Sequence, residues 1–396
     1  MTRIVLILAA ITAVVVLALR PTARHDIQFV VTSDAHYGIT RPTFRGRQRV
    51  DAHIVNAALV AALNTVPGLQ FPLDGGLGAG RPVGAMDFVV ETGDVTNRQE
   101  DNGGQTIQDA AASWAQFVTD YLEGLRLTGP AGERVPIYIV PGNHEASNAV
   151  GFYRTMSPAT DVTPLVEIFN RMMAPPQPRT LSTFDYQADR VFFTRDFAGI
   201  HFVFLHIWPD SAMRARLERD LQSVHRSTPV ILFAHDQLDV EAKHFINPNG
   251  AHDVNATDQF ENLLADQLAD GTSIGAPTTI EQAQFEAFLT QHPNITAYFH
   301  GNSNWHQAYA WNGPSRTARL HAFRVDSPMK GEVSMLDETR LSFAIVTLDP
   351  TQRTMTVREC LWNTNPAVPT TPVVFGDAVT VALEPRPGST NVLPTR

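Results

Sequence analysis

Acidic, amide and imidazole side chains follow directly after five short apolar runs of this chain. The five loops contain Asp34 and His36; Asp94 and Asn97; Asn143, His144 and Glu145; His235 and Asp236; and Asn302 and Asn304. Short runs of β-branched and aromatic residues bounded by turn residues predict buried strands. Sites in α/β sheets form beyond the carboxyl ends of strands, so five such strands can deliver these groups to one place. This combination of side chains predicts a metal site.

The elements between these loops indicate an α/β fold. Helical spacing of apolar residues predicts helices over residues 50–63, 106–125, 212–224 and 279–292. The first two alternate with strands as βαβαβ, which predicts a parallel sheet. A hairpin is expected over residues 190–207, because Gly199 supplies the turn. Antiparallel strands are expected over residues 308–349, with one more strand at 354–361.

Three segments lie outside this regular pattern. An apolar run at residues 4–19, between Arg3 and Arg20-Pro21, predicts a cleavable signal peptide or an uncleaved membrane anchor within residues 1–25. Residues 26–362 are expected to form the catalytic domain, with insertions at about 68–86 and 236–280. Residues 363–396 are rich in Pro and Thr and are expected to be a surface tail.

In their order, the five loops resemble the calcineurin-like metallophosphoesterase superfamily, whose motifs are D-x-H, G-D-x-x-[DN], G-N-H-[DE], a lone His and G-H-x-H. The resemblance extends over about residues 27–310. It implies a four-layer α/β/β/α sandwich with mixed sheets that holds two divalent metals. Taken singly, Asp34, Asp94, Asn143 and His144 are also typical of turns and helix caps. Because all of these residues occur in the order of the family's motifs, a metal site is favoured over turn and cap roles alone.

The resemblance implies a role for each loop residue. Asp34 and His36 would bind one metal, Asp94 would bridge both, and Asn143 and His235 would bind the second. His144 would stabilise the transition state or protonate the leaving oxygen. Glu145 would orient His144, Asn97 would help to position substrate or a ligand, and Asp236 is either a supporting carboxylate or the start of a loop. Two metals about 4 Å apart can share a carboxylate, generate the attacking hydroxide and clamp the phosphoryl oxygens.

The last motif departs from the family pattern. Asn302 and Asn304 stand where G-H-x-H has its two histidines, which ligate the second and the first metal respectively. Amide oxygens are harder donors than imidazole, so Mn²⁺, Mg²⁺ or Ca²⁺ is expected rather than Zn²⁺, with the second site the weaker. His300 and His306 flank the motif, and either could replace a missing ligand or support the site.

Composition limits the classes of partner. The chain has 396 residues, 43% of them hydrophobic and 18% charged, which is typical of a globular protein. Its net charge of −10 disfavours nucleic acid. Cys360 is the only cysteine, so no intrachain disulfide can form.

The sequence therefore predicts an exported, periplasmic or extracellular, hydrolase of phosphate mono- or diesters. Small organophosphates, nucleotides or phospholipid head groups are the expected substrates, and membrane contact is expected only through an uncleaved N-terminal segment. Two alternatives stay open because both histidines of the last motif are asparagines. One is a catalytically impaired family member that acts as an exported binding or scaffold protein, and the other is a one-metal hydrolase.

Overall fold

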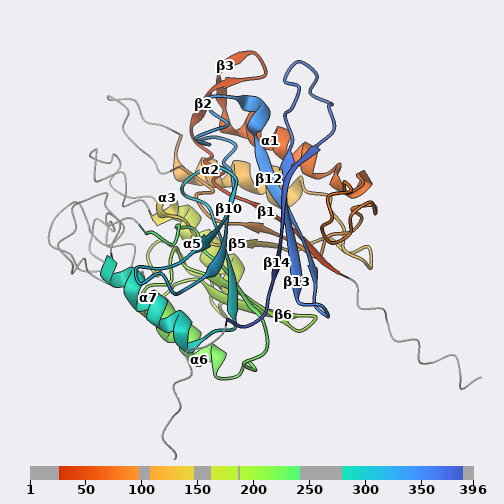
Figure 1. Cartoon of the computed structure of the whole chain (residues 1–396). Helices are drawn as coiled ribbons and strands as arrows, with labels where there is room; N and C mark the ends of the chain where they lie inside the picture. The colour runs from red at the N-terminus through yellow and green to blue at the C-terminus, as the bar shows by residue number, and fades with distance from the viewer. Residues whose placement is uncertain (1–25, 98–107, 147–161, 186–187, 241–278, 387–396) are drawn as a thin grey trace, which may run out of the picture.

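A computed structural model of the chain describes residues 26–97, 108–146, 162–185, 188–240 and 279–386, which are coloured in Figure 1. Two six-stranded mixed sheets form its centre. The first has the strand order β14 (Val374–Ala382), β13 (Thr354–Leu361), β12 (Ser342–Asp349), β1 (Ile27–Thr32), β4 (Phe88–Glu91) and β5 (Ile137–Ile139). The second has the order β10 (Gln307–Trp311), β11 (Leu320–Arg324), β9 (Ile295–His300), β8 (Val230–Phe233), β7 (Ile200–Leu205) and β6 (Phe192–Phe197).

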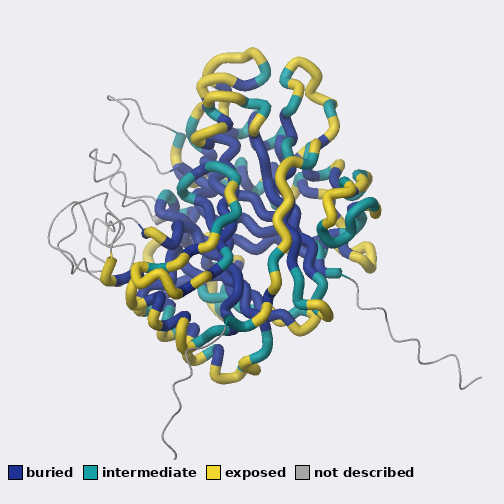
Figure 2. Tube along the Cα trace, in the orientation of Figure 1, coloured by how far each residue is buried: buried dark blue, intermediate teal, exposed yellow. Residues whose placement is uncertain are grey.

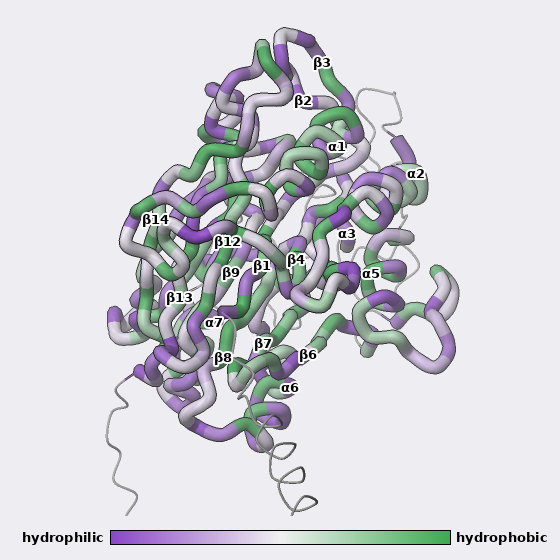
Figure 3. Tube along the Cα trace, turned by 90° about the vertical axis from the view of Figure 1, so that its right-hand side faces the viewer, coloured by the Kyte–Doolittle hydropathy of each residue, from purple (hydrophilic) through white to green (hydrophobic). Residues whose placement is uncertain are grey.

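An aromatic core joins the two sheets face to face. Phe29 of β1 stacks on Phe88 at a centroid distance of 4.5 Å, and its ring meets Phe233 and Phe299 of the second sheet edge-on at 5.8 and 6.0 Å. The central strands are buried in both sheets, as the dark blue strands of Figure 2 show. Figure 3 shows hydrophobic stretches in green along strands of both sheets, for example at β7 and β8, with hydrophilic stretches in purple between them. This packing fixes the ends of the two sheets relative to each other.

Helices form two groups beside the sheets (Figure 1). The first contains α1 (Ala52–Leu63), α2 (Ala110–Phe117), which continues into a π-helical segment at Val118–Glu123, and α5 (Thr163–Met173). The second contains α6 (Ser211–Leu221) and α7 (Thr279–Gln291), which are linked by the hydrogen bond from Arg214 to Gln284. The predicted helices are thus present, and the mixed α/β fold class is confirmed. No helix among the described residues is long and apolar enough to span a membrane, and residues 1–25 lie outside them.

Shorter elements complete the chain. A two-stranded ribbon, β2 (Thr40–Phe44) and β3 (Arg47–Asp51), precedes α1, and α3 (Asn143–Ala146) follows β5. Single 3₁₀ turns lie at Val66–Gly68 and Glu338–Arg340. The expected insertion at 68–86 is irregular and is attached to the first sheet, since the carboxylate of Asp74 pairs with the guanidinium of Arg358 at 2.7 Å. Most of the second expected insertion, 241–278, lies outside the described residues.

One expectation about the strands is confirmed and one needs correction. Strands β10 and β11 are antiparallel as predicted, and β12 is antiparallel to β1 and β13, while β11 also pairs in parallel with β9. The Pro- and Thr-rich segment after Asn363 also contains a strand, because β14 pairs with β13 at the edge of the first sheet. Most residues of β14 are exposed, and its sequence lacks the unbroken apolar run that marks the buried central strands. Cys360 of β13 is buried, and burial raises the pKa of its thiol.

Candidate metal centre

The loops that follow β1, β4, β5, β8 and β9 meet at one end of the paired sheets. The backbone N–H of Asp34 donates to the carbonyl of Gly93 at 2.9 Å, which joins the first two loops. The Nδ1 of His235 contacts the carbonyl of Thr92 at 2.8 Å, and the N–H of Gly301 donates to the carbonyl of His235 at 3.0 Å. Loops from both sheets therefore share one hydrogen-bonded framework, as expected from the strand ends.

The backbone at this junction adopts conformations that side chains usually avoid. Asp34, His36, Asp94 and Asn302 have φ angles of +56°, +44°, +52° and +61°, in the left-handed region. Such strain is retained where the surrounding structure fixes it, commonly at functional sites. A Cβ atom at Gly142 would lie 2.3 Å from Asp94 Oδ1, so a larger residue there would displace this carboxylate. The loops are thus built around the positions of their acidic groups.

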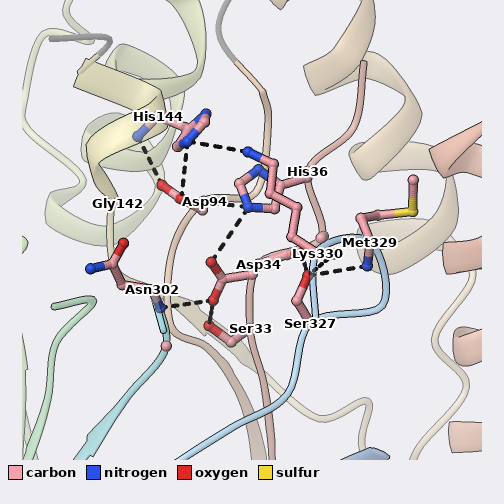
Figure 4. Close-up of polar contacts among 12 residues, drawn as sticks. Ser33, Asp34, His36, Asp94, Gly142, His144, Asn302, Ser327, Met329 and Lys330 are labelled. Carbon is pink, nitrogen blue, oxygen red and sulfur yellow. Dashed lines mark hydrogen bonds and ion pairs between the residues drawn. The ribbon is translucent and has the colours of Figure 1, made fainter. Parts of the chain in front are cut away.

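The first cluster of possible metal ligands contains Asp34, His36 and Asp94 (Figure 4). His36 Nε2 lies 3.5 Å from Asp34 Oδ1 and 3.6 Å from Asp94 Oδ2. Burial and the nearby Lys330 ammonium lower the pKa of His36, which favours the neutral imidazole that a metal needs. Asp34 Oδ1, both nitrogens of His36 and Asn304 Oδ1 are buried and make no hydrogen bond to any described residue.

The second cluster contains Asp94, Asn143 and His235. His235 Nε2 lies 3.3 Å from Asp94 Oδ1 and 3.0 Å from Asn143 Oδ1, so three donor atoms converge. The contact of Nδ1 with the carbonyl of Thr92 directs Nε2 toward this point. Burial works against the charge of His235, but the adjacent Asp94 carboxylate raises its pKa well above the usual value. The pKa of Asp94 is correspondingly low, because His144 and His235 offset the effect of its burial.

These donor atoms suit two divalent cations. Two sets of ligand atoms, one from His36, Asp94 and His144 and one from Asp34, Asp94 and His235, each lie within 4.8 Å of one another. Asp94 belongs to both sets, which is the arrangement that a bridging carboxylate requires. The unpaired acceptors on Asp34 and His36 are otherwise costly in a buried site, so a cation accounts for them.

The sequence profile of the calcineurin-like phosphoesterase family (Metallophos) matches residues 27–303. The chain belongs to this family. Among solved structures, a dimetal phosphatase from Danio rerio is 10% identical, with a TM-score of 0.47, and the alignment covers 89% of this chain and 98% of that one. Vps29 from Chaetomium thermophilum is 10% identical (TM-score 0.32; 92% and 99% covered). Phosphopantetheinyl hydrolase from Mycobacterium tuberculosis is 11% identical (TM-score 0.32; 77% and 91% covered). No curated protein sequence matches the chain.

The asparagines of the last motif differ in their surroundings. The backbone N–H of Asn302 donates to Asp34 Oδ2 at 3.1 Å, and its side-chain Nδ2 donates to Gln237 Oε1 at 2.7 Å. The amide of Asn302 is therefore fixed by Gln237, a partner that the sequence analysis missed. Asn304 Oδ1 instead has no partner among the described residues.

His300 does not take over from these asparagines. Both nitrogens of His300 are engaged, Nδ1 with the carbonyl of Gly301 at 3.0 Å and Nε2 with the Tyr309 hydroxyl at 2.9 Å. Burial and the charge of Arg324 lower the pKa of His300 to about 3. Burial lowers the pKa of His306. Its predicted supporting role at the metal centre stays a prediction.

Glu145 holds the loops of the site together. The Glu145 carboxylate accepts hydrogen bonds from the backbone N–H groups of Asp94, Thr96 and Gly142 at 2.7–3.0 Å. These contacts give Glu145 a role in holding the loops together, and its expected orientation of His144 stays a prediction. Burial and the charge of Asp94 raise the pKa of Glu145 to about 7.

Two further predicted residues lie close to the metal ligands. Asp236 is buried, and the effect of its carboxylate on His235 agrees with a supporting role. Asn97 is buried as well, and its Oδ1 accepts a hydrogen bond from Lys330 Nζ at 3.2 Å.

Lys330, like Gln237, is a residue near the site that the sequence analysis missed. Its Nζ lies 3.3 Å from His144 Nε2 (Figure 4), although the residue follows the last motif by almost 30 positions. Lys330 is one of only two lysines in a chain whose other basic residues are all arginines. That rarity was visible in the sequence, but nothing in it placed Lys330 near His144.

Proposed function

We propose that this protein is an exported, metal-dependent hydrolase of phosphate mono- or diesters. The observation that carries the proposal is the sharing of Asp94 between two groups of possible ligand atoms, whose members are buried except for the partly exposed His144. The expected substrates are small organophosphates, nucleotides or phospholipid head groups. The net charge of −10 supports this choice, because it disfavours long-range attraction of a polyanion such as nucleic acid.

Seven residues of the site are proposed to bind the two cations. Asp34, His36, Asp94 and Asn304 would hold the first divalent cation, and Asp94, Asn143, His235 and Asn302 the second. The cations would supply positive charge for the phosphoryl oxygens and would make a water nucleophilic near neutral pH. Mn²⁺, Mg²⁺ or Ca²⁺ suits the amide and carboxylate oxygens better than Zn²⁺ does.

His144 is placed to act on the leaving group. Its backbone N–H donates to Asp94 Oδ1 at 2.8 Å, which ties the residue to the shared carboxylate. Its Nε2 lies 3.7 Å from Asp94 Oδ2, and the side chain keeps 12% of its surface exposed. The imidazole therefore borders the ligand cluster and remains accessible to a substrate. From this position it can hold a proton for the departing ester oxygen.

Export is proposed from the sequence alone. The apolar run at residues 4–19 has the length of a signal-peptide core, and its flanking arginines suit either a cleaved signal or an anchor. N-terminal sequencing of protein recovered outside the cytoplasm tests this proposal. An intact N-terminus in a cytoplasmic fraction would contradict it.

The hydrolase proposal is tested with p-nitrophenyl phosphate and bis-p-nitrophenyl phosphate, using Mn²⁺, Mg²⁺, Ca²⁺ and Zn²⁺ in turn. Asp94→Asn should abolish turnover and lower the amount of bound metal, because one substitution removes a negative charge from both clusters. Circular dichroism should show that the variant keeps its fold. Undiminished turnover in a folded Asp94→Asn protein would refute the assignment.

A second candidate function is an exported binding protein without catalysis. The two asparagines of the last motif favour it, since both replace imidazole ligands of the family pattern. Metal analysis separates the possibilities: two ions with turnover support the dimetal hydrolase, and one ion with turnover supports a one-metal hydrolase. Bound metal with no turnover of any ester supports the binding protein.

A further inference from the structure

A polar hollow of about 490 Å³ lies between the first turn of α7 and the end of strand β10. We call it the α7 hollow. Its walls include two aromatic rings, a carboxylate, two amides and a guanidinium, contributed by Tyr309, Trp311, Asp239, Gln282, Asn312 and Arg316. None of these residues is among the proposed metal ligands. The set of side chains suits a polar organic group.

The α7 hollow adjoins a loop of the proposed metal centre. Asp239 follows Gln237 by two residues, so their Cα atoms are at most about 7 Å apart. Gln237 in turn accepts the hydrogen bond from the side-chain amide of Asn302 at 2.7 Å. On the β10 side, the Tyr309 hydroxyl contacts Nε2 of His300, just before that loop, at 2.9 Å. Two walls of the hollow are therefore connected to the residues around Asn302.

Hydrogen bonds fix the walls of the α7 hollow in place. The Glu286 carboxylate on α7 accepts the backbone N–H groups of Ser315 and Thr317 at 2.9 and 3.1 Å. These bonds fasten the loop after β10 to the helix. The indole Nε1 of Trp311 donates to Asp239 Oδ1 at 2.9 Å, which joins two further walls. Preorganised walls lower the entropic cost of binding a ligand.

Gln282 carries a hydrogen-bond donor that the described part of the protein does not satisfy. The residue lines the α7 hollow and is 5% exposed, and its Nε2 makes no hydrogen bond to any described residue. A buried donor without a partner costs free energy, so its presence in a wall indicates a ligand atom that accepts. The Asp239 carboxylate can accept further hydrogen bonds besides the one from Trp311. The hollow thus offers one donor and one acceptor.

We propose that the α7 hollow binds the hydroxyl-bearing alcohol part of the substrate, as in a sugar phosphate. The proposal rests on the proposed phosphoesterase function. A hydroxyl group both donates and accepts, so neighbouring hydroxyls can pair with the Gln282 amide and the Asp239 carboxylate together. An alkyl group would leave the Gln282 donor unpaired, and sites built around such donors reject ligands that lack the matching group. The rings of Tyr309 and Trp311 supply apolar surface for the carbon skeleton.

The test compares two esters of primary six-carbon alcohols, glucose 6-phosphate and hexyl phosphate, by phosphate release with Mn²⁺. The parent protein should have the higher kcat/KM for glucose 6-phosphate. Gln282→Leu should lower this value by about 2- to 10-fold, the effect of one neutral hydrogen bond. Asp239→Asn should lower it at least as much, because a charged acceptor becomes neutral. For hexyl phosphate both losses should be much smaller.

Gln284→Leu is the matched control, because it makes the same change at an exposed position two residues further along α7. This variant should keep the preference of the parent protein for glucose 6-phosphate. The melting temperature of Gln282→Leu should be unchanged or raised, since the substitution removes a buried donor without a partner. A lowered melting temperature with unchanged kcat/KM for both esters would make Gln282 a structural residue and overturn the proposal.

Calorimetric binding of glucose 6-sulfate, which has no phosphoryl group, to the Mn²⁺-loaded proteins gives a readout that does not depend on turnover. Gln282→Leu should weaken this binding by the same factor as kcat/KM, with an unchanged metal content. Turnover of both esters without a preference, or equal losses for both in Gln282→Leu, would overturn this proposal and leave the hydrolase proposal intact. A parent protein that binds glucose 6-sulfate through Gln282 but hydrolyses neither ester would refute the hydrolase proposal alone.

Discussion

At the scale of single residues, the two asparagines of the last motif lie in different surroundings. The amide of Asn302 is restrained by its 2.7 Å hydrogen bond to Gln237, whereas Asn304 Oδ1 is buried with no partner among the described residues. A cation bound by Asp34 and His36 would give the Asn304 oxygen a partner. The two positions are therefore not equivalent, although the sequence treats them alike.

Restoring one imidazole at a time should reveal this difference. Asn304→His should tighten Zn²⁺ binding by about tenfold or more, roughly 1.4 kcal/mol, because imidazole is a softer donor than an amide oxygen. Asn302→His should gain less, since it also removes the hydrogen bond to Gln237. Competition with a chromophoric chelator measures both affinities, and Mn²⁺ serves as the comparison metal. Equal Zn²⁺ affinities for the parent and the Asn304→His protein would mean that other atoms complete the shell.

At the scale of elements, the sequence predicted those strands that a local pattern of apolar and turn residues defines. The five site strands were visible because each is a short apolar run followed by a turn with Asp, Asn or His. Strand β14 was missed because its side chains are mostly exposed, and only pairing with β13 makes it a strand. The role of Glu145 and the position of Lys330 were missed for a related reason. Both depend on contacts between distant segments.

The hairpin of β6 and β7 is joined to α6 by a histidine between two acids. His201 Nδ1 lies 2.8 Å from Asp196 Oδ1 on β6, and Nε2 lies 2.8 Å from Asp220 Oδ2 on α6. Burial opposes protonation, but the two carboxylates outweigh it, so the pKa of His201 is raised. Protonated His201 therefore binds both elements more strongly than the neutral form does.

This link predicts a pH dependence of stability. Because the folded-state pKa lies above the unfolded value of about 6.5, the stabilisation is complete below that pH and is lost as pH rises through the folded-state pKa. His201→Gln should therefore be most destabilising under acidic conditions and should approach the parent stability at alkaline pH. Urea unfolding of both proteins across this range measures the difference, with the exposed His225→Gln as control. A difference that is constant with pH would contradict the ion-pair account.

At the scale of the whole molecule, the proposed metal centre lies where the two sheets meet. The first sheet supplies Asp34, His36, Asp94 and Asn143, and the second supplies His235, Asn302 and Asn304. The aromatic core holds the sheets together, and beyond it Asp34 Oδ1 and Asn304 Oδ1 are buried with no hydrogen bond to any part of the chain that the structure describes. Cations bound there would connect the sheets at the end where the apolar core stops.

Removal of divalent cations should therefore destabilise the entire fold and not only the site. An ion present at a hundred times its dissociation constant stabilises the native state by about 2.7 kcal/mol per site, provided that the unfolded chain does not bind it. We expect the Mn²⁺-loaded protein to unfold at a clearly higher urea concentration than the chelated protein, in one transition for both sheets. Asp94→Asn should show a much smaller shift, because the carboxylate common to both clusters is lost. An equal shift in this variant would place the stabilising metal elsewhere, and separate transitions would show that the sheets unfold independently.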